Sequence, residues 1–363
     1  KDLYVVLYTS GTTSQSKGVA LSHRNAMAAS VAFLATLPTR DDLVHLHVGG
    51  MFHLSGVGPA WYITLSGGTN VILPKFDVDA VMRAIPQHRI TNIVLVPTMI
   101  NMLINHPALA EFDLSSVKTS VYGGSPMPAA VLDGATRKLP SWGFHQIYGV
   151  TETAGYGVAF NWKEHLKALA GSPKRLKAAG QVVPGMQLKV VRPDGTEAPL
   201  GETGEVIMRG DNVMTGYLNN EKASAEALKD GWMHSGDAGF MDEEGFLYIA
   251  DRLKDMIVTG GENVYSLDVE RALYQHPAVR EAAVIGIPSD RWGEAVHAVV
   301  VLKDGQSAAE QDLIMHCRRL IGRYKCPRSI EFRTDPLPVT PVGKIRKNVL
   351  RDPYWEGRSR KIN

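Results

Sequence analysis

Cysteines are scarce in this chain, and it has no long apolar run. Its 363 residues include two cysteines, Cys317 and Cys326, which cannot form a disulfide framework. A reducing, cytoplasmic setting is therefore the simplest interpretation. No apolar run reaches the roughly 18 residues that span a bilayer, so no transmembrane segment is expected. No spacing of cysteine and histidine is typical of a metal site.

An excess of charge of one sign is also missing. The 39 Lys and Arg residues nearly balance the 37 Asp and Glu residues, so nothing argues for nucleic acid as a bulk partner. There is no signal peptide, internal repeat or low-complexity tract. The chain begins within a few residues of an apolar segment, 3–8, that is typical of a buried strand, which suggests that a preceding part is absent from this numbering. The length allows roughly two domains.

The first 150 residues alternate between strand-like and helical segments. Strands are expected at 69–73, 92–96, 117–122 and 145–148, and helices at 77–88, 98–105 and 128–139. This alternation predicts an α/β fold with a mostly parallel sheet covered by helices. Ligands bind such sheets beyond the carboxyl ends of the strands. Three candidate loops follow strands here: the one after Tyr8, GGSPMP after Tyr122 and GVTETAG after Tyr148.

Residues typical of turns become frequent later in the chain. Short alternating runs between them predict a small β-rich subdomain at about 180–250, within a large domain of residues 1–250. A charged and then glycine-rich stretch follows, and residues 251–363 are expected to form a compact, mobile α+β domain. There a capping box, Ser307 with Glu310, predicts the start of a helix. The apolar face of that helix is expected to contain Leu313, Cys317, Leu320 and Ile321.

The stretch YTSGTTSQSKGVALS, residues 8–22, concentrates hydroxyl residues around one glycine and one lysine. Glycine lets backbone N–H groups face an anion, hydroxyls donate hydrogen bonds, and lysine supplies a compact positive charge. It is not the GxxxxGK[ST] loop of common nucleotidases, because Ser16 precedes Lys17. From these residues alone, a phosphate-binding loop and a plain polar surface loop both remain open.

Five further motifs follow this stretch in a fixed order. They are YGVTE (148–152), TGY (215–217), WMHSGD (232–237), DRLKDMIVTGGENV (251–264) and PVGK (341–344). Together the six motifs resemble the adenylate-forming superfamily over essentially the whole chain, and most closely its acyl-CoA synthetase branch. The resemblance implies a further N-terminal region, which this chain lacks, so activity of the chain by itself is left open.

The resemblance implies a two-step reaction. A carboxylate attacks the α-phosphate of ATP to give an acyl-adenylate and pyrophosphate, and the thiol of coenzyme A then releases AMP. Mg²⁺ is the implied metal, and the acid is expected to be a medium- or long-chain fatty acid. An aryl acid of the cinnamate or benzoate type, and a nucleotide-binding fragment without complete turnover, are the alternatives. The sequence leaves acyl specificity and a homodimer open.

The resemblance also assigns the hydroxyl-rich loop to the β- and γ-phosphates of ATP. The residues that match the family pattern there are Ser10, Gly11, Thr12, Thr13 and Lys17. Ser14 and Ser16 depart from the pattern, which usually has Gly and Pro at these positions. This departure removes no hydrogen-bond donor, so the phosphate assignment is kept.

The YGVTE motif supplies the implied metal ligand. Glu152 is an oxygen donor suited to a hard cation such as Mg²⁺. Thr151, the second catalytic residue of the motif, is expected to hydrogen-bond the α-phosphate. Tyr148 is expected to lie along the adenine, with Gly149 beside it. A strand end with a solvated glutamate is the alternative.

Two further segments are assigned to the adenine and the acid. The resemblance places Gly123, Gly124 and Ser125 along the adenine and acyl pocket, although a plain turn would explain them as well. His53, in MFHLSG, matches a family histidine or aromatic residue near the acyl carboxylate. A buried histidine with a structural role is the alternative there.

The remaining assignments fall near and beyond the domain boundary. Asp237 is expected to accept hydrogen bonds from the ribose hydroxyls, and Arg252 to contact the ribose. Lys344, in PVGK, is the catalytic cation expected to reach the α-phosphate and carboxylate oxygens. Lys254 is the expected hinge between the two half-reactions, and Gly261 is expected to line the pantetheine tunnel, where a side chain would narrow the passage.

Overall fold

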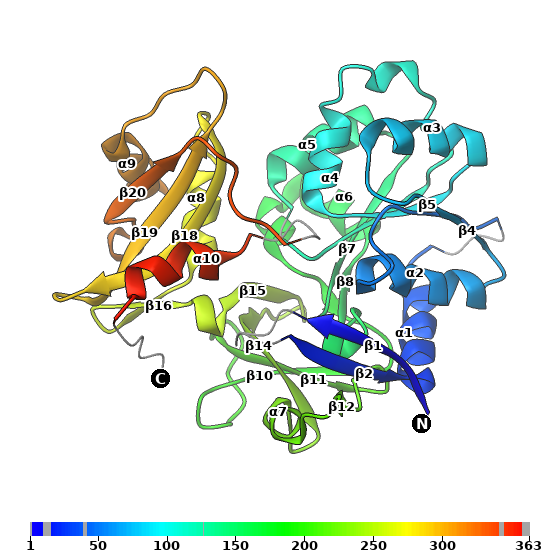
Figure 1. Ribbon diagram of the computed structural model, residues 1–363, viewed down its shortest axis with the longest axis horizontal. Helices are drawn as coiled ribbons and strands as arrows, with labels where there is room; N and C mark the ends of the chain where they lie inside the picture. The colour runs from blue at the N-terminus through cyan, green and yellow to red at the C-terminus, as the bar shows by residue number, and fades with distance from the viewer. Residues whose placement is uncertain (1, 10–15, 39–41, 126, 341–344, 358–363) are drawn as a thin grey trace. The chain divides into compact units, whose positions relative to one another are not determined.

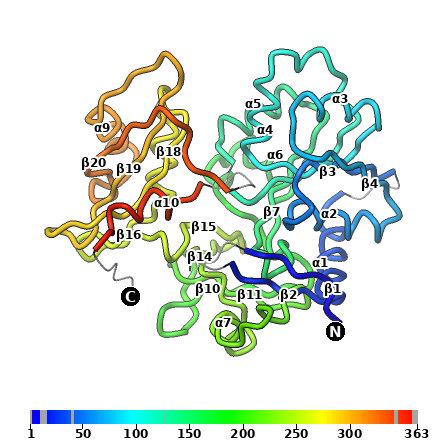
Figure 2. The backbone as a smooth tube through the Cα atoms, in the orientation of Figure 1, coloured from blue at the N-terminus to red at the C-terminus, as the bar shows by residue number. Residues whose placement is uncertain are grey.

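The computed structural model describes residues 2–9, 16–38, 42–125, 127–340 and 345–357. The chain divides into two compact units (Figures 1 and 2). The large unit contains Lys1–Ser235 and Gly239–Ile249, and the small unit contains Gly236–Ala238 and Ala250–Asn363. Within the described residues, we find no helix with the length and apolar character needed to cross a membrane.

A seven-stranded sheet organises the large unit, in the order β4-β3-β5-β6-β7-β8-β9. Neighbouring strands from β4 to β7 along this order pair in parallel, whereas β8 pairs antiparallel with both β7 and β9. The bounds are β3 Val44–His47, β4 Thr69–Ile72, β5 Asn92–Leu95, β6 Thr119–Tyr122, β7 Gly143–Tyr148, β8 Val158–Phe160 and β9 Gln181–Val182. The expected α/β fold with a mostly parallel sheet is confirmed.

Helices cover both faces of this sheet because successive strand residues point to opposite sides. Ile93 and Leu95 of β5 join the core beneath one group of helices, whereas Val94 packs into the core on the other face. The first group is α3 Val78–His88, α4 Pro97–Ile104 and α5 Ala129–Lys138; the other face is covered by α1 His23–Thr36 and α2 Leu54–Leu65 (Figure 1). The unit also contains α6 Trp162–Gly171 and α7 Glu221–Ala227.

The strand at the start of the chain does not belong to the parallel sheet. Strand β1 (Leu3–Thr9) pairs antiparallel with β2 (Lys17–Ser22), and β12 (Gly216–Tyr217) joins β2 to complete a separate three-stranded sheet. The sequence suggested a buried strand here, which is wrong, because Leu3 and Tyr8 are 54% and 65% exposed. An apolar run alone does not distinguish a central strand from the edge of a hairpin.

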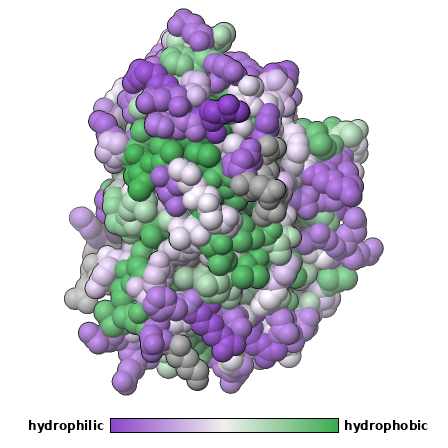
Figure 3. Space-filling view, turned by 90° about the vertical axis from the view of Figure 1, so that its right-hand side faces the viewer, coloured by the Kyte–Doolittle hydropathy of each residue, from purple (hydrophilic) through white to green (hydrophobic). Residues whose placement is uncertain are grey.

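The expected β-rich subdomain is a second sheet of the large unit. Its order is β10-β11-β14-β13, with β15 paired to β14. The bounds are β10 Met186–Val191, β11 Gly204–Gly210, β13 Leu228–Lys229, β14 Trp232–Met241 and β15 Leu247–Arg252. Elsewhere in the large unit, α1 exposes the apolar residues Met27 and Val31. Helix α1 is therefore apolar on both its buried and its exposed sides. The face of the molecule drawn in Figure 3 has apolar surface, coloured green, among polar surface.

The small unit is a mixed sheet between helices. The order is β17-β16-β19-β18, with β20 parallel to β19. The bounds are β16 Ile257–Thr259, β17 Glu262–Val264, β18 Val279–Ser289, β19 Gly293–Leu302 and β20 Ser329–Arg333. Helices α8 (Ser266–Leu273) and α9 (Glu310–Leu320) pack on one face, and α10 (Lys347–Arg351) contributes to a second core on the other.

Short 3₁₀ turns occur in both units, at Leu109–Glu111, Thr151–Thr153, Pro173–Lys177, Leu253–Asp255, Arg323–Lys325 and Asp352–Trp355.

Helix α9 starts differently from the sequence expectation. Its N-cap is Ala309, and the Asp312 carboxylate accepts a hydrogen bond from the Ala309 N–H at 3.2 Å, so the Ser307 and Glu310 capping box is wrong. Leu313 and Cys317 are buried as expected, but Leu320 is 45% exposed. The cap lies two residues later than expected because a carboxylate at the third helical position can satisfy the same backbone donor.

Candidate active site

Three loops lie together at the carboxyl ends of the parallel strands of the large unit. A Cβ atom on Gly123, after β6, would lie 2.7 Å from the carbonyl oxygen of Ile147 in β7. A Cβ atom on Gly155 would lie 2.5 Å from Cδ2 of Leu54, at the start of α2. These close approaches need glycine, and they bring the GGS, GVTETAG and MFHLSG segments to one edge of the sheet. This edge is where open α/β sheets bind ligands.

The GVTETAG loop is held in one conformation by its own backbone and by Asn212. A Cβ atom on Gly149 would lie 2.5 Å from the carbonyl carbon of Gly155, so the loop folds tightly back on itself. The buried side-chain amide of Asn212 donates to the carbonyl oxygen of Thr153 at 3.0 Å. The 3₁₀ turn Thr151–Thr153 that carries Thr151 and Glu152 is therefore fixed from both sides.

Glu152 contacts a tyrosine from another part of the chain, and that tyrosine lies beside a lysine. The Tyr217 hydroxyl donates to Oε1 of Glu152 at 2.7 Å, and the Nζ of Lys17 lies 4.9 Å from the Tyr217 ring centroid. Tyr217 reaches this place because β12 pairs with β2, where Tyr217 is opposite Val19. Since Lys17 and Val19 share one face of β2, the lysine and the tyrosine also share a face. The TGY motif supports the family resemblance, but no role for Tyr217 follows from the sequence alone.

This cluster combines an anion, a cation and an orienting hydroxyl. A carboxylate oxygen is a ligand that Mg²⁺ prefers, and a lysine ammonium nearby suits the phosphate oxygens of a metal–nucleotide complex. The donor set therefore fits Mg²⁺ bound together with a triphosphate. The other proposed phosphate ligands, Ser10, Gly11, Thr12 and Thr13, lie outside the described residues. Thr9 and Lys17, the nearest strand residues on either side of this stretch, pair across the hairpin of β1 and β2.

His53 has a structural contact that its proposed catalytic role does not require. Its Nδ1 accepts a hydrogen bond from the Ser55 N–H at 3.2 Å and lies 2.9 Å from the Ser55 hydroxyl, so His53 caps the N-terminus of α2. The apolar residues Met51 and Phe52 precede it and are 39% and 70% exposed. The histidine is thus held at the start of α2 beside an exposed apolar loop.

The residues proposed for the adenine lie on two of these adjoining loops. Gly124 has a left-handed backbone with φ of 79°, which favours glycine, and Ser125 after it is exposed. Tyr148 is the last residue of β7 and is half-buried, opposite Val158 of β8. Gly124 and Ser125 can therefore form a turn and line a binding site at the same time.

The small unit brings the two proposed ribose residues into direct contact. The Nε of Arg252 lies 2.7 Å from Oδ1 of Asp237, and the Asp237 side chain is buried. Lys254 follows in the 3₁₀ turn Leu253–Asp255. Burial lowers the pKa of Lys254, while Asp255 opposes this shift and Arg252 adds to it. The proposed ribose site and the proposed hinge are therefore electrostatically coupled.

Gly261 lies in the two-residue turn that joins β16 to β17. Gly260 and Gly261 have φ of 61° and 84°, and Thr259 pairs with Glu262 across the turn. Both central residues need a left-handed backbone, which explains the glycine pair. Open space surrounds the Cβ position of Gly261, where no described heavy atom comes within 4 Å. Lys344 lies outside the described residues.

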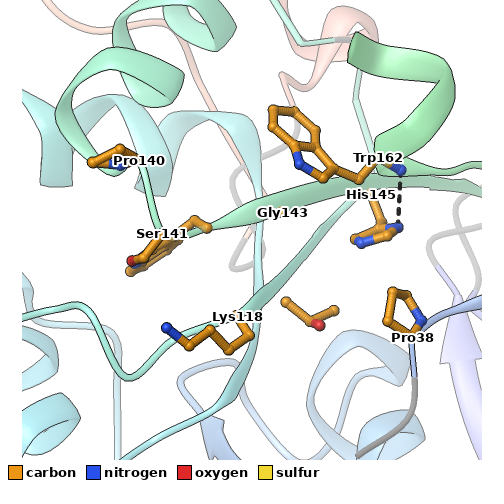
Figure 4. A pocket seen from close by; sticks show the side chains of 9 residues that line it. Pro38, Lys118, Pro140, Ser141, Gly143, His145 and Trp162 are labelled. Atoms are coloured by element: carbon orange, nitrogen blue, oxygen red, sulfur yellow. Dashed lines mark hydrogen bonds between the residues drawn. The ribbon is translucent and has the colours of Figure 1, made fainter. Parts of the chain in front are cut away.

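A pocket of about 290 Å³ lies at the opposite edge of the parallel sheet (Figure 4). It is lined by Pro38, Lys118, Thr119, Pro140, Ser141, Trp142, Gly143, His145 and Trp162. Thr119 and Gly143 begin β6 and β7, so this pocket is at the amino ends of the strands. His145 is fixed there by accepting a hydrogen bond from the Trp162 N–H at 3.2 Å, shown as a dashed line. This pocket contains none of the site residues proposed from the sequence.

Comparison with known proteins identifies the family. Residues 1–218 match the AMP-binding enzyme family, and residues 268–344 match the AMP-binding enzyme C-terminal domain. The chain belongs to the AMP-binding enzyme family. The expected resemblance to adenylate-forming enzymes is therefore confirmed.

Named relatives agree with this assignment. The enzyme is 40% identical to a feruloyl-CoA synthase of Amycolatopsis over 96% of its own length and 70% of the relative. It is 38% identical to a fatty acid–acyl-carrier-protein ligase of Streptomyces coeruleorubidus, over 98% and 68% of the two chains. The structure resembles the O-succinylbenzoate coenzyme A synthetase of Bacillus subtilis in complex with ATP and magnesium, with a TM-score of 0.83 and 32% identity over 94% and 68%. The chain is thus an AMP-forming acid–CoA ligase that uses ATP.

Proposed function

We propose that this AMP-binding enzyme joins an apolar carboxylic acid to coenzyme A through an acyl-adenylate. The observation that carries the proposal is the cluster of Glu152, Tyr217 and Lys17, next to the loops at the carboxyl ends of the parallel strands. The cluster offers a metal ligand and a phosphate-binding cation, as the adenylation of a carboxylate by ATP requires. Mg²⁺ bound there would neutralise charge on the phosphates.

The first group of proposed roles concerns the phosphates, the adenine and the acid. In the large unit, Lys17 with Ser10, Gly11, Thr12 and Thr13 holds the β- and γ-phosphates. Thr151 bonds the α-phosphate and Glu152 is the metal ligand. The adenine and acid lie along Tyr148, Gly149, Gly123, Gly124, Ser125 and His53.

Asp237 and Arg252 hold the ribose, and Lys344 supplies positive charge to the adenylation step. Lys254 is the hinge of a mobile C-terminal domain of residues 251–363, which follows a large domain of residues 1–250. Gly261 lines the passage for the pantetheine thiol.

A medium- or long-chain fatty acid is our first candidate for the acid. The exposed apolar residues Met51 and Phe52 beside His53 support an apolar acid, and one relative is named a fatty acid ligase. An aryl acid is the second candidate, because another relative is named a feruloyl-CoA synthase. A cytoplasmic location and a homodimer stay predictions.

A panel of acids tests the substrate class. The enzyme is incubated with ATP, Mg²⁺ and coenzyme A and with fatty acids from butyrate to palmitate, ferulate, cinnamate or benzoate, and the thioester is read by mass. The proposal expects hexanoate or a longer fatty acid to give the fastest turnover. Ferulate as the best acid would favour the aryl alternative. Binding of ATP by calorimetry without any thioester would indicate a nucleotide-binding fragment.

The change Lys344→Ala tests the division of labour. We expect loss of acid-dependent exchange between pyrophosphate and ATP, because the charge that stabilises the adenylation transition state is removed. Transfer of a supplied acyl-adenylate to coenzyme A should remain within about threefold of the unchanged enzyme. Equal loss of both half-reactions would contradict the proposed role of Lys344.

A further inference from the structure

A buried cluster of charges lies directly after the segment that contains Lys344. The Nζ of Lys347 is 2.7 Å from Oε1 of Glu270 and donates to the Ser266 hydroxyl at 2.5 Å. The Ser266 hydroxyl donates in turn to Oδ2 of Asp251 at 2.6 Å. Each donor has an acceptor in this chain of contacts, and Ser266, Glu270 and Asp251 are buried.

The cluster joins three segments that are far apart in the sequence. Lys347 opens α10, Glu270 and Ser266 belong to α8, and Asp251 is in β15, next to the proposed ribose residue Arg252. Glu270 also accepts a hydrogen bond from the Val284 N–H of β18 at 2.8 Å. Helix α10 is therefore bonded to the middle of the small unit rather than to its surface.

A second contact fixes the same short helix one turn later. Arg351 lies 3.3 Å from Oδ1 of Asp255, in the 3₁₀ turn of the proposed hinge, and both side chains are largely buried. Between the two basic residues, Leu350 is buried in the apolar core. Residues 347, 350 and 351 share one face of a helix, so α10 is anchored to the segment 251–255 at two points.

The chain on either side of residues 341–344 is also anchored. Val339 and Ile345 form an isolated β-bridge, and the Arg346 N–H donates to the Pro338 carbonyl oxygen at 2.7 Å. Ile345 packs against the same core as Leu350. The described residues next to Lys344 thus have a fixed place in the small unit.

A buried ion pair contributes little net stability, because the cost of removing both charges from water offsets their attraction. What such a pair does supply is a defined geometry. Burial alone would lower the pKa of Lys347, but the carboxylates of Glu270 and Asp251 raise it above its ordinary value, so the lysine stays charged. Such an anchor defines the position of α10, a short helix that begins three residues after the proposed catalytic lysine.

We propose that Lys347 is a positioning residue for adenylation: with Glu270, Ser266 and Asp251 it fixes α10 and thereby places Lys344 relative to the segment 251–255. This inference rests on the proposed role of Lys344. In this proposal Lys347 acts through Lys344 and not on a reacting group: it fixes α10, which begins three residues after Lys344 along the chain.

The test compares both half-reactions in matched variants. Lys347→Met together with Glu270→Gln removes one charge of each sign, so the net charge of the buried cluster does not change, and Lys347→Arg keeps the charge. Lys303→Met is the control, because Lys303 is an exposed lysine of the same unit that donates to the Pro277 carbonyl oxygen. The assays are acid-dependent pyrophosphate exchange, and thioester formation from a supplied acyl-adenylate, with the acid that the panel selects.

The double variant should lose at least tenfold in pyrophosphate exchange and less than threefold in thioester formation. Lys347→Arg should recover most of the exchange, and Lys303→Met should match the unchanged enzyme. In a Lys344→Ala background the double variant should change the residual exchange less than twofold. An effect that acts through Lys344 disappears when the Lys344 side chain is absent, so the two changes should not be additive.

Three results would overturn the positioning role: no loss of exchange, an equal loss of both half-reactions, or the same fold-loss with and without Lys344. The Lys344→Ala variant alone reports on the proposed function. Full exchange activity in that variant would remove the role of Lys344 itself. A loss there, combined with an undiminished effect of the double variant, would overturn only the positioning role.

Discussion

The hydrogen bond between Tyr217 and Glu152 gives the sharpest single prediction for the proposed site. Tyr217→Phe removes the hydroxyl that donates to the Glu152 carboxylate at 2.7 Å and keeps the ring beside Lys17. The change therefore tests the orientation of the carboxylate without removing the lysine contact. The shape of the side chain stays almost the same.

The magnitude follows from the charge and the burial. A hydrogen bond to a charged group is worth about 1.5 to 3 kcal/mol. Tyr217 and Glu152 are both half-buried, so water can replace part of the lost bond and we expect the lower limit. About 1.5 kcal/mol corresponds to roughly a tenfold loss in kcat/KM for ATP. The concentration of Mg²⁺ that gives half-maximal rate should rise in parallel, because the carboxylate is no longer held in one orientation.

The assay is pyrophosphate exchange at varied ATP and Mg²⁺. Tyr4→Phe is the matched control, since Tyr4 belongs to β1 of the same small sheet and has no proposed site role; it should stay within about twofold. A Tyr217→Phe enzyme that melts normally and keeps its kcat/KM and its Mg²⁺ requirement would refute the reasoning.

Two further predictions concern stability. Gly149→Ala should lower the free energy of unfolding by roughly 2 kcal/mol or more, because its Cβ would lie 2.5 Å from the carbonyl carbon of Gly155. The control is Gly171→Ala in α6, where the added Cβ has space and should not lower the free energy of unfolding. Equal melting curves for the two variants would contradict the predicted clash. Burial, with a smaller effect of His47, lowers the pKa of His45 to about 3. The unfolded chain then binds the extra proton between about pH 6.5 and 3, so stability is full above pH 6.5 and falls as the pH decreases through this range. His45→Gln should reduce that slope in chemical unfolding and the exposed His88→Gln should not; an unchanged slope for His45→Gln would count against the buried neutral histidine.

The sequence by itself determined the order of most strands and helices along the chain. The run Asn92–Leu95 forms a strand because apolar residues on both sides of it are covered by helices, and such runs are visible without coordinates. The six motifs also predicted the family and the reaction class, because the residue types at phosphate and metal positions are set by chemistry rather than by packing.

Only the tertiary structure decided which of these residues meet. Tyr217 contacts Glu152 because β12 adds to β2, and Lys347 contacts Glu270 because α10 and α8 both pack against β18. Neither pairing has a signal in local sequence, since the partners are 65 and 77 residues apart. The hairpin of β1 and β2 was misjudged for the same reason: a strand's neighbours depend on pairing with distant segments, whereas its apolar pattern depends only on its own residues.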